Sequence, residues 1–180
     1  IMKFFRIETS SFYKMENYMT GDPRFAKINT TRKYEIVKAW CKKEFGNLEI
    51  AARAKVNAPI PFMFNGSILA MSLIGEDSTP APRLKDVELE YPEKTLNEIL
   101  DCMKRLYKNN LVHADISEYN ILMHDNTPYL IDFGQAVVLL HPSAMDFLSR
   151  DVANILDYFE KTYGIEKGFA ETMRLITSAK

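Results

Sequence analysis

The sequence is poor in cysteine and has no long apolar run. Cys41 and Cys102 are the only cysteines among 180 residues, and their spacing matches no metal site. We therefore interpret both as buried thiols of a protein in a reducing compartment. No apolar stretch approaches the length that crosses a bilayer, and no signal peptide opens the chain. These absences predict a cytoplasmic protein without a membrane partner.

An excess of charge of one sign is also lacking. The chain carries 23 lysine and arginine residues against 24 aspartate and glutamate residues, a net charge of −1. Such a balance gives no general electrostatic attraction to nucleic acid, although it leaves room for local patches. With 47% apolar and 26% charged residues, the composition is that of an ordinary globular chain of one domain or two small lobes.

The most informative stretch runs from Leu111 to Gly134. Within it, Asp115 precedes Asn120 by five residues, and Asp132-Phe133-Gly134 follows after two short apolar runs. This spacing matches the paired H-x-D-x-x-x-x-N and D-F-G motifs of kinases. Each residue alone would be interpreted as an ordinary turn or loop residue, as aspartate and asparagine commonly are. Because all three fit one template, we predict that they form a phosphoryl-transfer site.

Phosphoryl transfer gives each of these residues a role. Asp115 is the predicted general base, which orients the attacking hydroxyl and accepts its proton. Asn120 and Asp132 are predicted to hold magnesium on the nucleotide phosphates. A turn over residues 124–128 would join the two apolar runs into a hairpin and bring Asn120 and Asp132 to the same end. His113 is interpreted as a buried, hydrogen-bonded histidine and not as a proton shuttle.

A second pair of residues comes from the N-terminal part of the chain. Lys3 lies in the middle of a strand expected over Ile1–Ile7, and Glu44 lies on the apolar stripe of a helix expected from Lys33 to about Ala52. For either residue in isolation, an exposed or snorkelling side chain is the usual interpretation. The kinase-like motifs favour the alternative, an ion pair between Lys3 and Glu44 that serves the nucleotide phosphates.

The segments between these residues predict two lobes. A hairpin is expected over Pro59–Leu73 around the turn Asn65-Gly66, and the polar, proline-rich segment 76–82 that follows is the natural boundary. We therefore predict a partial N-terminal lobe over residues 1–74 and a C-terminal lobe over residues 75–180. Residues 8–31 are expected to form a mobile loop, with a short helix around Ser11–Tyr18.

Three further helices are expected in the C-terminal lobe. They cover Tyr91–Lys108, a segment that starts at His141-Pro142 with proline at the first helical position, and a stretch around Phe169–Ile176. Asp151 lies on the apolar face of the second of these helices. Because a buried carboxylate needs hydrogen bonds, we interpret Asp151 as an acceptor for backbone N–H groups of the stretch around Asp115.

Two kinase elements are absent from the sequence. No G-x-G-x-x-G motif occurs, and no A-P-E tripeptide follows Gly134. The chain opens at Ile1 inside an expected strand, so we expect the phosphate-covering loop to lie before Ile1. The short passage from Gly134 to His141 leaves no room for an ordinary activation loop or substrate platform. The predicted fold class is α+β and two-lobed, protein-kinase-like, with an incomplete N-terminal lobe and a reduced C-terminal lobe.

Several motifs resemble those of RIO-type atypical serine protein kinases. The most specific are Leu111–Asn120, Ile131–Ala136 and His141–Asp151, and Arg6–Phe12, Gly21–Phe25 and Lys43–Leu48 also fit. The resemblance is to the first RIO subgroup, in a short form similar to the archaeal members. It implies an ATP-dependent serine/threonine kinase, an ATPase or both, which uses Mg²⁺ or Mn²⁺. The implied setting is maturation of the small ribosomal subunit, with the subunit precursor as partner.

The resemblance also implies site residues. Lys3 and Glu44 would form the ion pair beside ATP, and Ser72 and Ile74 would offer backbone groups to adenine. Asp132 would receive phosphate as an intermediate in addition to holding metal. Two alternatives stay open from the residues alone. One is a small-molecule kinase of the aminoglycoside or choline type, and the other is a scaffold that uses nucleotide as a conformational switch with little turnover.

Overall fold

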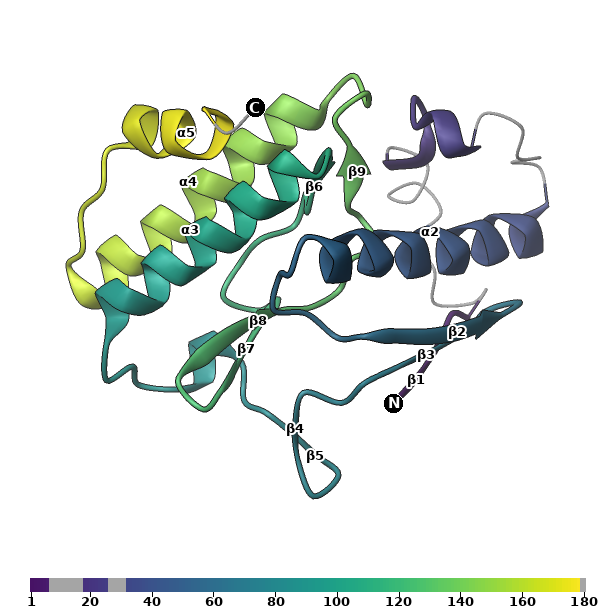
Figure 1. Cartoon of the computed structure of the whole chain (residues 1–180), viewed down its shortest axis with the longest axis horizontal. Helices are drawn as coiled ribbons and strands as arrows, with labels where there is room; N and C mark the ends of the chain where they lie inside the picture. Colours follow the sequence, from purple (N-terminus) through teal and green to yellow (C-terminus); the bar gives the residue numbers. More distant parts are fainter. Residues whose placement is uncertain (7–17, 26–31, 179–180) are drawn as a thin grey trace.

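The computed structural model describes residues 1–6, 18–25 and 32–178 (Figure 1). Its N-terminal part contains a three-stranded antiparallel sheet in the order β1-β3-β2, formed by Met2–Phe4, Ile68–Met71 and Pro61–Asn65. Helix α2, Lys33–Arg53, lies along this sheet and packs on β2 and β3. The sheet and helix therefore bring the first residues of the chain close to the middle of α2.

The sheet register follows from the predicted hairpin. Asn65 pairs with Ile68, and Gly66 between them has a φ of +58°, which glycine adopts without a steric penalty. In β1, Lys3 lies opposite Leu69. The strand is shorter than predicted, because regular pairing covers only Met2–Phe4.

Helix α2 buries the predicted apolar stripe and also three polar side chains. Its buried apolar side chains are Val37, Ala39, Trp40, Cys41, Leu48 and Ala51. Lys43, Glu44 and Asn47 are buried as well, with side chains at most 1% exposed. Buried polar groups need partners, so this face of α2 must be matched by polar groups elsewhere in the chain.

The C-terminal part consists of helices α3 (Pro92–Lys108), α4 (Ala144–Tyr163) and α5 (Phe169–Thr177), with two small strand pairs beside them (Figure 1). Strand β6, Leu111–Val112, pairs with β9, Val137–Val138. Strand β7, Ile121–His124, pairs with β8, Thr127–Leu130. The predicted hairpin is therefore confirmed, and both loops of the kinase-like stretch start and end on paired strands. Among the described helices, none is both long and apolar enough to cross a membrane.

The segment after the first sheet forms a small hairpin, which the sequence did not predict. Strand β4, Gly75–Glu76, pairs with β5, Thr79–Pro80, across a turn whose two residues have positive φ. A Cβ atom on Gly75 would lie 2.1 Å from the Thr79 carbonyl oxygen, so only glycine fits there. The Pro82 carbonyl then accepts a hydrogen bond from the Met123 N–H, which ties the segment to β7. The lobe boundary at residue 75 stays a prediction.

Helix α4 begins at Ala144, so the prediction that Pro142 occupies its first position is wrong. The His141 Nδ1 atom accepts a hydrogen bond from the Ser143 N–H instead, and this turn precedes the helix. Pro142 packs against Gly21, where an added Cβ would lie 2.7 Å from the proline Cδ. The predicted helix around Ser11–Tyr18 and most of the loop 8–31 lie outside the described residues.

Candidate active site

The β7–β8 hairpin places Asn120 beside Asp132. Ile121 pairs with Leu130 at the open end of the hairpin, and the Ile131 N–H donates to the Asn120 carbonyl at 3.0 Å. Asn120 and Asp132 therefore lie just beyond the paired strands, on the same edge. Asp132 has a φ of +61°, a left-handed conformation that aspartate tolerates better than most residues.

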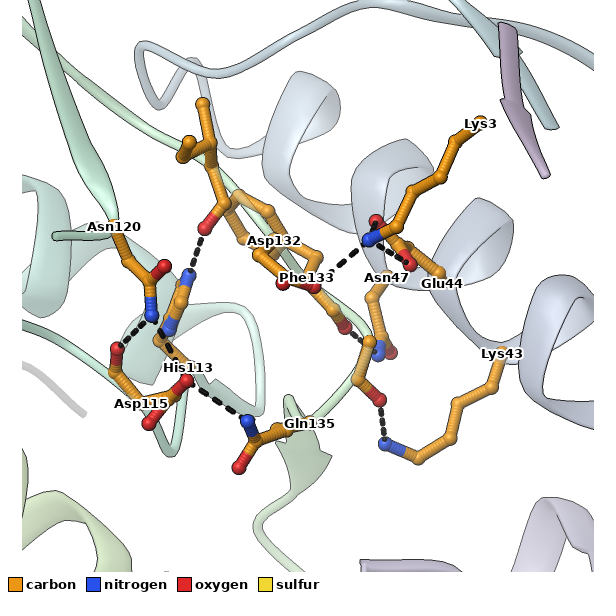
Figure 2. A network of polar contacts seen from close by, with 12 residues as sticks. Lys3, Lys43, Glu44, Asn47, His113, Asp115, Asn120, Asp132, Phe133 and Gln135 are labelled. Carbon is orange, nitrogen blue, oxygen red and sulfur yellow. Dashed lines mark hydrogen bonds and ion pairs between the residues drawn. The ribbon is translucent and has the colours of Figure 1, made fainter. Parts of the chain in front are cut away.

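Asp115 is bound by side chains from both loops (Figure 2). Its Oδ2 atom accepts hydrogen bonds from Asn120 Nδ2 and Gln135 Nε2, each at 2.8 Å. Asn120 Nδ2 also reaches the Asp115 carbonyl at 2.9 Å. The sequence did not single out Gln135, which directly follows the Asp-Phe-Gly motif. These contacts fix the orientation of the Asp115 carboxylate and join the two kinase-like loops.

Asp151 on α4 binds the backbone of the loop that carries Asp115. Its two carboxylate oxygens accept hydrogen bonds from the Ala114 N–H at 2.8 Å and the Ile116 N–H at 3.0 Å, which confirms the predicted structural role. Arg150 binds the Ala114 carbonyl through Nη2. Ala114 has a φ of +65°, so these contacts hold a conformation that alanine rarely adopts. Burial raises the pKa of Asp151 to about 7, against the opposing effect of the two N–H groups and Arg150.

His113 is a buried structural residue, as predicted. Its ring is 2% exposed, packs edge-on against Phe133 at 4.7 Å, and places Nε2 3.0 Å from the Ile131 carbonyl. Burial lowers the pKa of His113 to about 4. The neutral ring therefore donates Nε2–H to Ile131, which anchors the residue that precedes Asp132.

Lys3 connects the first sheet to both α2 and the Asp-Phe-Gly loop. Its Nζ atom lies 2.9 Å from both carboxylate oxygens of Glu44 and 2.9 Å from Asp132 Oδ1 (Figure 2). The predicted Lys3–Glu44 contact is therefore present, and Asp132 is an additional partner. One ammonium group bridges two carboxylates from different parts of the chain.

The charges of this triad influence one another. Burial acts to lower the pKa of Lys3, but the two carboxylates raise it above its ordinary value, so the ammonium stays protonated. Burial raises the pKa of Glu44, against the attraction of Lys3. Burial also acts to raise the pKa of Asp132, but Lys3 and the Gly134 N–H together hold it below its ordinary value. Asp132 is therefore an ionised, partly exposed carboxylate next to a cation.

Two further buried side chains of α2 hold the backbone after Asp132 (Figure 2). Lys43 Nζ donates to the carbonyl oxygens of Gly134 at 2.8 Å and Ala136 at 2.6 Å. Asn47 Nδ2 donates to the carbonyl oxygens of Phe133 at 2.8 Å and Ala136 at 2.9 Å. The sequence predicted neither role. One feature of the sequence could have indicated these roles. Lys43 and Asn47 stand four residues apart, so they lie on the same face of α2, beside the apolar stripe.

Gly134 is required by its contact with α2. A Cβ atom at this position would lie 2.7 Å from Trp40 Nε1 and 3.2 Å from Glu44 Oε2. The backbone of the Asp-Phe-Gly loop therefore passes directly over the helix that carries Glu44, closer than any side chain would allow.

The predicted adenine contacts lie where β3 leaves the sheet. The Ser72 N–H donates to the Ile60 carbonyl, and the Ser72 hydroxyl accepts from the Ile60 N–H at 2.8 Å. The Ile74 carbonyl accepts from the Ala81 N–H. These bonds pin the segment between β3 and β4 and engage neither the Ser72 carbonyl nor the Ile74 N–H.

The site offers the donor types that a nucleotide-bound divalent ion needs. Asn120 supplies an amide oxygen and Asp132 a partly exposed, ionised carboxylate, and Mg²⁺ typically takes one or two carboxylates together with substrate phosphates. A different trio, Glu76, His124 and Asp125, has its ligand atoms within 4.8 Å of one another, outside this site.

The chain is similar to known proteins over most of its length. The RIO domain family model matches residues 1–172. The chain is 46% identical over 165 residues to the RIO-type serine/threonine-protein kinase Rio1 of Thermoplasma acidophilum, covering 92% of this chain and 86% of that protein. It is 42% identical over 160 residues to Rio1 of Haloferax volcanii, covering 89% of this chain and 55% of that protein.

The fold is shared with a solved kinase. The crystal structure of the Rio2 kinase–ADP/Mg²⁺–phosphoaspartate complex from Chaetomium thermophilum matches with a TM-score of 0.69 and 22% identity, over 84% of this chain and 48% of that one. This likeness shows an α+β, protein-kinase-like fold. Together with the family match over nearly the whole chain, it leads to one conclusion: the chain belongs to the RIO family of serine/threonine-protein kinases.

Proposed function

We propose that this chain transfers the γ-phosphate of ATP to a serine or threonine hydroxyl, to water, or to both, with Mg²⁺ or Mn²⁺ on the nucleotide. The observation that carries the proposal is the position of Lys3 Nζ, 2.9 Å from both Glu44 and Asp132. Phosphoryl transfer relies on a lysine–glutamate ion pair beside the phosphates and on a metal-binding aspartate. The names of the relatives support the same chemistry.

In this proposal the nucleotide lies between the first sheet and the β7–β8 hairpin. The Ser72 carbonyl and the Ile74 N–H contact the adenine edge, because the local hydrogen bonds leave these two groups available. Lys3 binds phosphate oxygens while Glu44 keeps its ammonium in place. Asn120 and Asp132 hold the divalent ion, which would neutralise charge on the phosphates.

Asp115 acts on the attacking group. The hydroxyl oxygen attacks the γ-phosphorus, the bond to the bridging oxygen of ADP breaks, and the hydroxyl proton moves to the Asp115 carboxylate. Hydrogen bonds from Asn120 and Gln135 to Oδ2 orient this carboxylate before the reaction. When the hydroxyl belongs to water, the same step is ATP hydrolysis.

Asp132 is the proposed acceptor in a two-step transfer. Its carboxylate is 45% exposed, ionised and next to Lys3, so it has the charge state and access of a nucleophile. The Chaetomium Rio2 kinase was solved as an ADP/Mg²⁺–phosphoaspartate complex, which supports this role by analogy. In the first step a carboxylate oxygen of Asp132 attacks the γ-phosphorus and the bond to ADP breaks. In the second step the oxygen of water or of a hydroxyl attacks the aspartyl phosphate, the Asp132 carboxylate leaves, and the hydroxyl proton moves to Asp115.

The proposed setting is the cytoplasm, with the small ribosomal subunit precursor as partner. Two observations support a narrow range of substrates. The resemblance to the first RIO subgroup points to subunit maturation, and α4 follows β9 after only a short turn. An extended platform for peptides in general would need a longer segment here. A small-molecule kinase is the competing proposal, since it shares the roles of Asp115, Asn120 and Asp132.

The experiment determines which molecule receives the labelled γ-phosphate of ATP. The protein expressed from its whole gene is incubated with labelled ATP and Mg²⁺, with and without small-subunit precursor particles. Label on protein or in free phosphate, increased by the particles, is the expected result. Label that appears only on an added aminoglycoside or choline would support the small-molecule kinase. An Asp115→Asn variant that binds ATP normally controls for contaminating kinases.

A further inference from the structure

A groove lies beside the N-terminal half of α2. It has a volume of about 770 Å³ and is bounded by the N-terminal half of α2, the turn Pro23–Phe25 and the β2–β3 turn at Asn65-Gly66. We call it the α2 groove. In Figure 1 the segment that contains Pro23–Phe25 lies above the N-terminal half of α2, and the β2–β3 turn lies below it.

The α2 groove is basic, although the chain as a whole is nearly neutral. Among the described residues, Arg24, Arg32, Lys38 and Lys42 line it against a single acidic residue, Glu35. The Lys38–Glu35 ion pair is long, at 3.7 Å, and both side chains are more than 40% exposed. An exposed pair of this kind contributes little energy, so Lys38 stays available to a ligand together with Arg32 and Lys42. The charge of Arg24 is compensated by the buried Asp22.

Aromatic side chains lie between these cations. Tyr34 and Phe64 are 50% and 37% exposed, and Phe25 is half-buried beside them. Lys38 Nζ lies 4.5 Å from the Tyr34 ring centroid, and the Arg24 guanidinium lies 5.4 Å from the Phe25 centroid. The α2 groove therefore offers apolar contact area together with positive charge, which suits a ligand that is both anionic and partly apolar.

One wall of the α2 groove is bonded to the active site. Arg24 forms ion-pair contacts with the buried Asp22, and its Nη1 atom donates to Asn47 Oδ1 at 2.8 Å. The other end of the Asn47 amide donates to the carbonyls of Phe133 and Ala136. Arg24 and Asn47 thus connect the groove to the backbone on either side of Gly134, and through it to Asp132.

We propose that the α2 groove binds an acidic peptide segment of a partner protein, and that Arg24 and Asn47 transmit its binding to the Asp-Phe-Gly loop. Acidic segments are recognised by clusters of arginine and lysine, and an apolar side chain of the segment would rest on Tyr34 or Phe64. Among the residues that the structure describes, the cations of the groove form one short cluster, whereas a nucleic-acid strand needs a track of cations that follows its backbone. The groove is also much larger than a free phosphate ion.

The binding test uses a short fluorescein-labelled peptide of glutamates around one phenylalanine, titrated with the full chain and followed by anisotropy. Reversal of both lysines, in Lys38→Glu with Lys42→Glu, is expected to weaken binding at least about five-fold. Lys94→Glu with Lys161→Glu changes the net charge equally on exposed sites of α3 and α4 and should leave binding unchanged. Equal loss in both double variants would show unspecific attraction and overturn the proposal.

A labelled oligouridylate of similar length serves as the competing ligand. If it binds the chain more tightly than the peptide and loses affinity in Lys38→Glu with Lys42→Glu, the groove is a nucleic-acid site and the peptide proposal is wrong. Tighter binding of the peptide, with affinity that falls as salt rises, supports it. Neither measurement depends on phosphoryl transfer, so its outcome is independent of the proposed function.

The fluorescence of Trp40 tests whether peptide binding in the groove changes the Asp-Phe-Gly loop. Trp40 is the only tryptophan of the chain, and its indole nitrogen lies against Gly134. Peptide binding is expected to change its emission. Arg24→Lys keeps the charge of the groove but cannot make the same forked contacts, so the peptide should bind within about two-fold while the emission change is lost. Asn47→Ala removes the amide that joins Arg24 to the Phe133 and Ala136 carbonyls, so it should also abolish the emission change. An unchanged emission response in both variants would contradict transmission.

Discussion

Lys3 and Asp132 contact each other at 2.9 Å although 129 residues separate them in the sequence. Lys3 lies in the middle of a short strand, and Asp132 lies where the β7–β8 hairpin ends. The contact brings the charged group of the first sheet to the loop that is proposed to hold metal. ATP phosphates would enter at this position and share Lys3 with the two carboxylates.

Replacing Lys3 should affect stability and activity separately. Lys3→Met leaves Glu44 buried without its cation, and loss of one partner of a buried pair costs about 3 kcal/mol. Adding Glu44→Gln should recover much of that loss, since the uncompensated charge is removed. Urea unfolding and γ-phosphate transfer measure the two effects. Recovery of transfer together with stability in the double variant would show that Lys3 has no role beyond folding.

Asp132→Asn should weaken metal-dependent nucleotide binding. The amide keeps the size of the side chain but removes the ionised oxygen that a divalent cation prefers. Titration with a fluorescent ATP analogue, in Mn²⁺ and in EDTA, measures the metal-dependent part. The variant is expected to lose about ten-fold in Mn²⁺ and nothing in EDTA. The same metal dependence as in the wild type would reject Asp132 as a ligand.

Lys43 should make stability depend on alkaline pH. Burial lowers its pKa from 10.5 to about 7, with the nearby Arg24 acting in the same direction. Between these values the unfolded chain binds more protons than the folded one, so the unfolding free energy should rise with pH, by at most about 1.4 kcal/mol per pH unit. Lys43→Met should show a smaller rise between the two pKa values in urea unfolding. If the unfolding free energies of the wild type and Lys43→Met changed equally with pH, the lowered pKa of Lys43 would be contradicted.

Two glycines provide a matched pair: Gly134 lies against α2, and Gly46 lies within α2 away from any neighbouring atom. Gly134→Ala places a methyl group 2.7 Å from Trp40 Nε1, so it should destabilise the fold by about 1–3 kcal/mol and disturb the loop. Gly46→Ala lies within α2 with no atom within 4 Å of the new Cβ, so it should stabilise by about 0.5–1 kcal/mol. Thermal unfolding of both variants measures this difference. A neutral Gly134→Ala would show that the loop does not need its close approach to α2.

Local patterns in the sequence predicted the elements and several long-range partners. The turn at Asn65-Gly66, the hairpin of β7 and β8 and the apolar faces of the helices follow from residue types and their periodicity. The role of Asp151 could be predicted because a carboxylate on an apolar stripe needs hydrogen bonds. The contact of Lys3 with Glu44 could be predicted only because the kinase-like motifs require such an ion pair.

The remaining contacts depend on how distant segments meet. Lys43 and Asn47 bind carbonyl oxygens 86 to 93 residues away, and a backbone carbonyl leaves no mark in the sequence. Gln135 has no periodic neighbour that would indicate its bond to Asp115. Pro142 was expected to start a helix from its local preference, but its packing against Gly21 depends on a segment far earlier in the chain.

The central claim is that Asp115 accepts the proton of the attacking hydroxyl. Asp115→Asn keeps an oxygen that can accept from Asn120 or Gln135, so the loop and ATP binding should persist. The most direct measurement is the single-turnover delivery of the γ-phosphate of ATP to water or to a hydroxyl, followed as free phosphate and phosphorylated hydroxyl at saturating nucleotide, in the wild type and in Asp115→Asn. We predict a rate about 10²–10⁴-fold lower in the variant at unchanged ATP affinity. A rate close to that of the wild type would contradict the account.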